Sequence, residues 1–252
     1  MSFNLSEYFS YYFSLVVADT PELLRQVYQI RYQVYCKELN YELKDNFTDR
    51  LEKDIYDSRS IHCLLKHHPS GRYIGCVRIV LPNWEHPEEP FPMETICTST
   101  LSLNPTSRLN YAEISRLAVI ADFRRRRGEQ NTSSGLLFPE LQNSPLITER
   151  RKFSLIPLSL YLACTAIVNI SNIQSVITLM EARLSRHLRR CDIPSRQVGN
   201  FVEFHGQRAP FVLSTEEVMN NMSAEIRGLF NNIYSQIKSS VSFHPLSNNY
   251  GI

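Results

Sequence analysis

Apolar residues recur at helical spacing directly after Thr20 and predict the first clear helix. Thr20 is a suitable cap, Pro21 suits a first turn, and apolar side chains then return every three or four positions. The pattern predicts an amphipathic helix over residues 20–35. Arg31 lies on or beside its apolar stripe, where an arginine either extends to solvent from the edge of the stripe or pairs with a buried acid.

Three apolar runs in the first half predict β-strands. Residues 61–66 and 73–81 flank the turn sequence HHPSGR, so we expect them to form an antiparallel hairpin. Residues 82–110 are rich in proline and predict a long loop. The run at 112–120, AEISRLAVI, is dense in apolar residues and predicts a central strand.

Charged side chains interrupt two of these strands. Arg78 lies within the second strand, and Glu113 and Arg116 lie within the third. A buried charge without a partner costs several kcal/mol, so we expect these groups to be paired if they are buried. Residues three apart on a regular strand face opposite sides, and a β-bulge between Glu113 and Arg116 would change that.

An irregular charged stretch covers residues 37–57 and holds seven acids and four bases. At its end Asp54 and Asp57 stand three residues apart, just before the first predicted strand. A solvated loop explains this composition. A carboxylate pair that binds a cation or an amine explains it as well, and the sequence leaves both interpretations open.

Helices and strands alternate in the second half, which predicts a mixed α/β fold in one domain over residues 1–252. Residues 128–152 are polar and aperiodic, and we predict that they form a mobile insertion. The predicted elements that follow are a buried helix at 154–170, a strand at 175–180, an amphipathic helix at 181–191, a hairpin through 201–213, and a C-terminal helix at 215–238.

Composition excludes several classes of protein. The chain has 252 residues, 43% of them hydrophobic, and a net charge of +2, so neither a disordered protein nor a general nucleic-acid binder is expected. The six cysteines have no CxxC spacing, which disfavours a zinc site and predicts small core residues in a reducing compartment. No basic residue precedes the first apolar segment, and the longest apolar run, 153–168, is short for a membrane span. We therefore expect a cytoplasmic protein without a transmembrane segment, and peripheral membrane association stays open.

Basic residues are concentrated in two places. Arg124, Arg125, Arg126 and Arg127 directly follow the central strand, and from Arg116 to Arg127 five arginines and one aspartate give a local charge of +4. Arg183, Arg186 and Arg190 share one face of the helix predicted at 181–191. A solvated basic loop is one interpretation, and a docking face for an acidic partner is the other.

Four segments of the first half resemble, in order, the motifs of the N-acyl homoserine lactone (autoinducer) synthases. They are RYQVY at 31–35, LEKDIYD at 51–57, IGCVRI at 74–79 and EISRLAV at 113–119. Segments at 123–126, 180–190 and 202–211 resemble a narrower group, the PEP-CTERM/exosortase system-associated acyltransferases. That group in turn resembles the long-chain N-acyl amino acid synthases. The resemblance covers residues 14–215.

The resemblance implies a GCN5-related N-acetyltransferase fold. Its sheet is mixed, mostly antiparallel and split between the fourth and fifth strands, which correspond to AEISRLAVI and SVITLM. In such proteins a bulge in the fourth strand frees a backbone N–H for the thioester carbonyl. One such donor contributes about 2.7–4 kcal/mol to the stabilisation of a developing oxyanion.

The resemblance also implies the reaction and the roles of the site residues. An acyl group passes from a thioester to an amine, and Glu113 removes the proton of the amine directly or through a water. Asp54 and Asp57 hold the acceptor, and Tyr35 forms a wall of its pocket. Three arginines are implied to orient these acids: Arg31, Arg78 and Arg116. One of the three arginines is implied to bind a carboxylate of the substrate.

The donor implied is an acyl-phosphopantetheine, with no tightly bound cofactor and no metal. The stretch at 124–130 has one glycine, so a backbone cradle for the pyrophosphate of coenzyme A is weak there. Its charge suits an acidic acyl carrier protein, bound by Arg124–Arg127 together with Arg183 and Arg186. The acceptor implied is an amino acid or a similar small amine. An N-acyl homoserine lactone synthase using S-adenosylmethionine and a non-catalytic acyl or amino-acid sensor remain alternatives.

Overall fold

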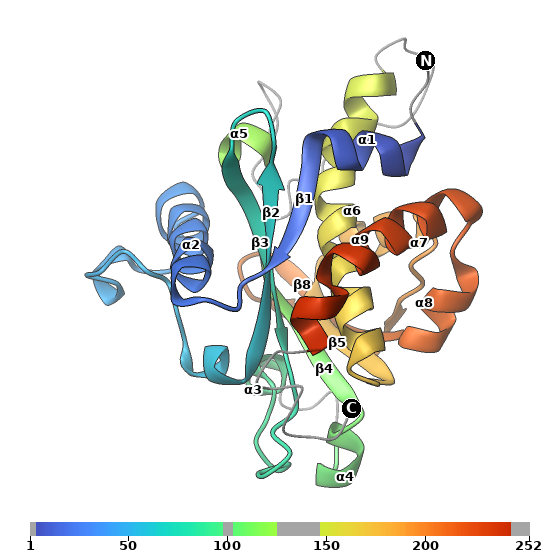
Figure 1. Cartoon of the computed structure of the whole chain (residues 1–252). Helices are drawn as coiled ribbons and strands as arrows, with labels where there is room; N and C mark the ends of the chain where they lie inside the picture. Colours follow the sequence, from blue (N-terminus) through green and yellow to red (C-terminus); the bar gives the residue numbers. More distant parts are fainter. Residues whose placement is uncertain (1–3, 98–102, 125–146, 243–252) are drawn as a thin grey trace.

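An eight-stranded sheet forms the centre of the computed structural model, which describes residues 4–97, 103–124 and 147–242 (Figure 1). The strand order is β1-β2-β3-β4-β5-β8-β6, and β7 pairs with β8. The strands are β1 (Phe13–Val17), β2 (Ser60–His67), β3 (Arg72–Val80), β4 (Tyr111–Val119), β5 (Ser175–Met180), β6 (Arg196–Gln197), β7 (Val202–Glu203) and β8 (Gln207–Ser214).

The predicted hairpin, the central strand and the strand at 175–180 are confirmed. β2 and β3 pair antiparallel, and β4 pairs with β3 on one side and with β5 on the other. Among the described strands, β4 and β5 are the one parallel pair. The sheet is therefore mixed and mostly antiparallel, as expected.

The sheet opens between β4 and β5. These strands pair through three positions, Tyr111↔Ser175, Ala112↔Val176 and Glu113↔Ile177, and the pairing then stops. Both strands continue beyond this point, β4 to Val119 and β5 to Met180. The last paired position, Glu113, therefore stands at the edge of the split.

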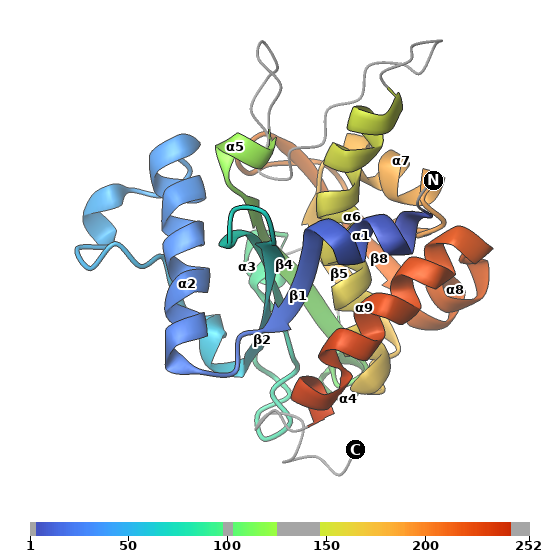
Figure 2. The ribbon, with the colours of Figure 1, turned by 45° about the horizontal axis from the view of Figure 1, so that its top comes forward.

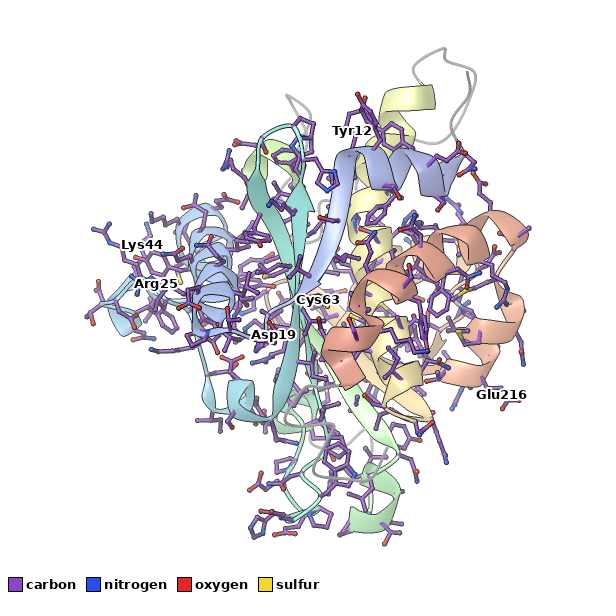
Figure 3. The ribbon with its side chains drawn as sticks, viewed as in Figure 1. Tyr12, Asp19, Arg25, Lys44, Cys63 and Glu216 are labelled. Carbon is purple, nitrogen blue, oxygen red and sulfur yellow. The ribbon has the colours of Figure 1, made fainter. Side chains whose placement is uncertain are left out.

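Helices cover both faces of the sheet (Figure 1). On one face lies α2 (Pro21–Arg31), capped by Thr20 as predicted, and it continues as a π-helix, η1 (Tyr32–Glu38). On the other face lies α6 (Ile147–Ile170), with α9 (Ala224–Ser242) packed beside it (Figure 2). Figure 3 shows Arg25 and Lys44 on the side of the molecule where α2 lies, away from the sheet, whereas Cys63 lies in the sheet.

Shorter elements connect these layers. The remaining helices are α1 (Leu5–Tyr12), η2 (Lys44–Asn46), η3 (Ile55–Arg59), α3 (Pro92–Ile96), α4 (Pro105–Arg108), α5 (Ala121–Arg124), α7 (Ala182–Arg190) and α8 (Thr215–Asn221). Among the described helices, none is both long and apolar enough to cross a membrane. All six cysteines are free, and five of them are buried, as expected of small core residues.

The prediction of a single helix over residues 215–238 is wrong, because the structure has two helices there, α8 and α9. Ser214 caps α8 by accepting a hydrogen bond from the backbone N–H of Glu217, at 3.3 Å. The helix ends at Asn221, and α9 begins at Ala224. Between them the backbone N–H of Ser223 donates to Asp192 Oδ2 at 3.1 Å. The side chain of Asp192 thus accepts a hydrogen bond from a backbone N–H that would bond to a carbonyl of the same helix if the helix were continuous.

Two predicted loops contain helical turns. The predicted insertion at 128–152 overlaps α6, because residues 147–152 form its first turns, and residues 128–146 lie outside the described part. The predicted loop at 82–110 contains the short helices α3 and α4. Arg59 of η3 donates hydrogen bonds to the carbonyl oxygen of Leu81, just before this loop, at 2.8 Å and to that of Pro90, within it, at 2.7 Å. These bonds fix the described part of that loop against η3.

Candidate active site

Arg31 is the centre of a buried ion network under the sheet. It is the last residue of α2 and is fully buried, so of the two interpretations of Arg31 the structure supports the pairing with buried acids and not the extension to solvent. Its Nε donates to Glu52, and its Nη1 donates to Asp57 Oδ1 at 2.6 Å. Burial acts to raise the pKa of Asp57, but the charges of Arg31 and Arg78 outweigh it and hold that pKa well below its usual range.

The spacing of Asp54 and Asp57 follows from a helix start. Asp54 is the N-cap of η3, and its Oδ1 accepts from the N–H of Tyr56 at 3.0 Å. Asp57 Oδ2 in turn accepts from the N–H of Asp54 at 2.8 Å, which completes a capping box. Both carboxylates then face Arg78 of β3, whose Nη1 lies 2.5 Å from Asp54 Oδ1 and 2.9 Å from Asp57 Oδ1.

Arg116 closes the network on the side of β4. Its Nε lies 3.2 Å from Glu52 Oε1, and its Nη2 lies 3.3 Å from Asp54 Oδ2 and 3.7 Å from Glu42 Oε1. Three arginines thus face three central acids, and the charges balance as buried charges must. The third acid is Glu52, whereas Glu113, which was expected from the sequence to be paired if buried, lies outside this network.

His62 on β2 lies against the same network without adding charge. Its Nε2 is 3.5 Å from Asp57 Oδ1, and the residue is 1% exposed. Burial, and after it the positive charge of Arg31, lowers the pKa of His62 to about 3. The imidazole is therefore neutral at physiological pH.

A β-bulge in β4 lets Glu113 and Arg116 face one space. Cys76 pairs with Ala118 and Arg78 pairs with Ser115, so two residues of β4 stand opposite the single Val77 of β3. Arg116 has a φ of 52°, the left-handed conformation typical of a bulge residue. The bulge that the resemblance implied is confirmed, and both side chains line the same hollow.

Glu113 is a buried carboxyl outside the ion network. It is 3% exposed, and its Oε2 accepts from the backbone N–H of Met93 at 2.7 Å. Within the described residues no cation lies within ion-pair distance of it. Burial raises the pKa of Glu113 to about 8. Such a carboxyl is typical of acid–base sites.

Small hollows line the split between β4 and β5. The first, which we call the Glu113 hollow, measures about 80 Å³ and is lined by Tyr35, Glu42, Met93, Glu113, Arg116, His205 and Arg208 among others. The second, the Met180 hollow, measures about 70 Å³ and is lined by Tyr35, Leu117, Tyr161, Met180 and Leu184 among others. Tyr35 and Arg208 line both hollows. Ligand pockets usually measure roughly 300–1,000 Å³, so a bound substrate requires these side chains to move apart.

An apolar gap continues from the Met180 hollow. It lies between α6, β4, β5, β8 and α8, and we call it the Val168 gap after one of its residues. Its lining includes Ile114 and Tyr161, which also line the Met180 hollow, together with Thr165, Val168, Val176, Leu213 and Val218. The split is thus charged on the side of Glu113 and apolar on the side of α6.

A larger cavity lies outside this split, on the outer side of η3. It measures about 510 Å³ and is lined by Tyr56, Arg59, Trp84 and Pro90 among others. Tyr56 connects it to the network, since the guanidinium of Arg78 lies 6.0 Å from the centre of the Tyr56 ring. Among the described residues, no group of acids, histidines and cysteines is arranged to hold a metal ion.

Several site residues were not identified from the sequence. Glu52 was visible, because it stands two positions before Asp54 inside the segment LEKDIYD. Glu42, His205 and Arg208 reach the Glu113 hollow from segments far apart in the sequence. His205 and Arg208 lie within the segment at 202–211 that carried the resemblance, but no role was assigned to them from the sequence.

The predicted donor residues separate in the structure. Arg124 is 3% exposed, and its Nη2 lies 2.7 Å from Glu38 Oε2, so its assignment to a docking face is wrong. Arg125, Arg126 and Arg127 lie outside the described residues. Arg183 and Arg186 are exposed on α7, whereas Leu188 on its opposite face is buried, as the helical pattern predicted.

Comparisons with known proteins agree with this geometry. Residues 30–133 match a family model described as an acetyltransferase (GNAT) domain. The structure is similar to that of a CoA-dependent acyl-homoserine lactone synthase, BjaI, with S-adenosylmethionine and isopentyl-CoA, at 15% identity over 88% of this chain and 89% of that one, with a TM-score of 0.54. It is similar to TofI in complex with an inhibitor and MTA, at 15% identity over 88% and 99% of the chains and a TM-score of 0.56.

An N-acyl amino acid synthase is among the similar structures as well. FeeM, from uncultured soil microbes, matches at 13% identity over 83% of this chain and 94% of that one, with a TM-score of 0.52. A comparison of the sequence with curated proteins finds no match. The family match over residues 30–133 and the shared fold identify the protein as an acyltransferase with the fold of the GCN5-related N-acetyltransferases.

Proposed function

We propose that the protein transfers a long-chain fatty acyl group from an acyl carrier protein to the amino group of an amino acid or a similar small amine. The observation that carries this proposal is the position of Glu113. It stands where β4 and β5 separate, with a buried ion network on one side and an apolar gap on the other. An amine and an acyl thioester need these two environments.

Glu113 is the proposed acceptor of the amine proton, directly or through a water, in the pH range where its carboxyl group is ionised. The nitrogen attacks the thioester carbon, the carbon–sulfur bond breaks, and the sulfur leaves as a thiol after it takes up a proton. Because the pKa of Glu113 is about 8, its carboxylate form dominates above that pH. A backbone N–H at the Arg116 bulge is the proposed donor to the oxyanion, consistent with the shift in strand register there.

The acceptor is proposed to bind in the Glu113 hollow. Asp54 does not line this hollow but lies 3.3 Å from Arg116, which does, and at 24% side-chain exposure it is more accessible to an ammonium group than Asp57, at 6%. Arg208 supports an acceptor that carries a carboxylate, because its Nε is buried and has no hydrogen-bond partner among the described residues. A free amino acid offers both groups, and so does the amino-acid part of S-adenosylmethionine.

The acyl chain is proposed to lie along the Met180 hollow and the Val168 gap. Their lining includes Val176 and Met180 of β5 and Tyr161, Thr165 and Val168 of α6. Burial of each methylene contributes about 0.8 kcal/mol, so a long chain gains the energy needed to part these side chains.

The carrier protein is proposed to dock on α7. Arg183, Arg186 and Arg190 are exposed there, and from Glu181 to Arg190 four arginines and one glutamate give a charge of +3. Such a surface attracts an acidic partner and accelerates association in a salt-dependent manner.

A homoserine lactone synthase is the alternative supported by the structural matches to BjaI and TofI. The experiment that separates the functions is an assay of the purified protein with hexadecanoyl carrier protein, hexadecanoyl-CoA and either a mixture of the twenty amino acids or S-adenosylmethionine. Mass spectrometry of the products distinguishes N-acyl amino acids from N-acyl homoserine lactones. We expect the former with the carrier protein as donor. Lactone products would establish the alternative, and binding without turnover would point to a sensor.

A further inference from the structure

His205 reaches the Glu113 hollow from the tight turn between β7 and β8. His205 and Gly206 both adopt positive φ values, 52° and 94°, and the N–H of Phe204 donates to the carbonyl of Gly206 at 3.0 Å. A left-handed conformation is uncommon for a residue other than glycine, although histidine adopts it more often than most. This turn holds the imidazole at the mouth of the hollow that contains Glu113.

The ring of His205 is fixed by stacking and not by hydrogen bonds. It lies nearly parallel to the ring of Tyr41, with 4.3 Å between centroids and 13° between planes. Across the described part of the chain, no group forms a hydrogen bond with either of its ring nitrogens, and the residue is partly exposed. The stack orients the imidazole and leaves both nitrogens available to a ligand or to solvent.

Positive charge next to the ring favours its neutral form. Burial, then Arg208 on β8 and Arg116 on β4, lower the pKa of His205 below its ordinary value of 6.5. The acids that line the same hollow are Glu42 and Glu113. At pH 7 the imidazole is therefore uncharged and has a nitrogen lone pair.

The carboxyl groups of the site are less suited to accept a proton at this pH. Glu113 has a pKa of about 8, so only about one molecule in ten carries the carboxylate form at pH 7. Asp57 is bound to two arginines, which hold its pKa low and make it a weak base.

We propose that His205 is a catalytic residue that accepts the proton of the acceptor amine at neutral pH. The inference rests on the acyl transfer proposed above. As the nitrogen–carbon bond forms, the nitrogen becomes acidic and gives a proton to the imidazole. The carbon–sulfur bond then breaks, the thiolate takes up one proton from the imidazolium or from water, and His205 returns to its neutral form. Glu113 takes over this role above pH 8, where it is ionised.

The test is the pH dependence of kcat/KM for His205→Phe, Glu113→Gln and the double variant, measured between pH 5.5 and 9.5 by thiol release from hexadecanoyl-pantetheine. Phenylalanine preserves the stack on Tyr41 and removes the base. We expect His205→Phe to lose about 100-fold at pH 7, to lack the acid limb of the wild-type profile, and to recover partly above pH 8. The double variant should stay low at every pH. Glu203→Gln, an exposed change two residues away, is the matched control and should behave as the wild type.

A second variant separates loss of the base from loss of the turn. We expect His205→Ala to be inactive at pH 7 and to recover activity on addition of imidazole, because the position opens to solvent. The proposal is wrong if His205→Phe keeps the wild-type acid limb, or if Glu113→Gln alone abolishes activity at pH 7. If the wild-type protein releases no thiol with any amine, the proposed function itself fails, which is a different result from either of these.

Discussion

Replacement of Glu113 by glutamine should make the protein more stable, and increasingly so as the pH rises. Glutamine has the same shape, and its carbonyl oxygen still accepts the hydrogen bond from Met93. The change removes a buried group that ionises without a cation at ion-pair distance among the described residues. A stabilising substitution at a proposed catalytic position is typical of a site that sacrifices stability for function.

The magnitude follows from the pKa. Glu113 in the unfolded chain ionises near 4.5, whereas in the folded protein its pKa is about 8. Between these values the folded state binds one proton more than the unfolded state, so stability falls as the pH rises and levels off above 8. At about 1.4 kcal/mol for each pH unit, the full loss is up to about 5 kcal/mol, of which about 4 kcal/mol falls between pH 5 and pH 9.

The assay is urea unfolding followed by the fluorescence of Trp84, the single tryptophan, at pH 5, 7 and 9. The free energy of unfolding of Glu113→Gln minus that of the wild type should rise by several kcal/mol over this range. Glu216→Gln, on α8 at the far side of the molecule from Lys44, is an exposed control and should give a constant difference (Figure 3). A difference for Glu113→Gln that does not change with pH would refute the reasoning.

Other predictions address the acceptor, the chain and the carrier. Asp57→Asn removes the carboxylate that the buried guanidiniums of Arg31 and Arg78 share, so it should cost about 3–5 kcal/mol in urea unfolding at pH 7, and the deficit should shrink as the pH falls below 4, where the wild-type aspartate also loses its contribution. It should raise the KM of the acceptor, measured at saturating donor, more than the KM of the donor, measured at saturating acceptor. Equal effects on the two KM values would indicate a structural role. Val168→Phe fills the apolar gap and should lower kcat/KM about tenfold for a 16-carbon donor relative to an 8-carbon donor; unchanged chain-length preference would place the chain elsewhere. Charge reversal of Arg183 together with Arg186 should slow transfer from a carrier protein at low salt and spare an acyl-pantetheine, and equal slowing of both donors would exclude docking on α7.

The sequence predicted the elements whose local patterns are strong. The hairpin of β2 and β3 and the strands β4 and β5 carry dense apolar runs, and their bounds came out within one or two residues. The edge strand β1 was not predicted, because FSLVV is short and follows aromatic residues that have no clear period. The break between α8 and α9 depends on Asp192, which is about thirty residues away, so no local pattern contains it.

Some features of the site were likewise predicted from the sequence, and others were not. The pairing of Arg31, Asp54, Asp57 and Arg78 was expected from the cost of buried charge and from the order of the motifs. The burial of Arg124 was not, since a run of four arginines indicates an exposed surface. Only the fold brings its first member against Glu38 at the end of the π-helix.

The π-helix after α2 has a consequence for how this chain tolerates insertions and deletions. A π-helix accommodates more backbone per turn than an α-helix. Here it directly follows Arg31 of the ion network and contains Tyr35, whose hydroxyl donates to the carbonyl of Leu117 at 2.9 Å. Loss of one residue between Tyr32 and Tyr35 would restore α-helical geometry, in which fewer residues complete a turn. The side chains within the segment would change direction, and Tyr35 would leave both hollows. The length of this segment is therefore constrained more tightly than the identity of its exposed residues, which is the reverse of what holds for a surface loop.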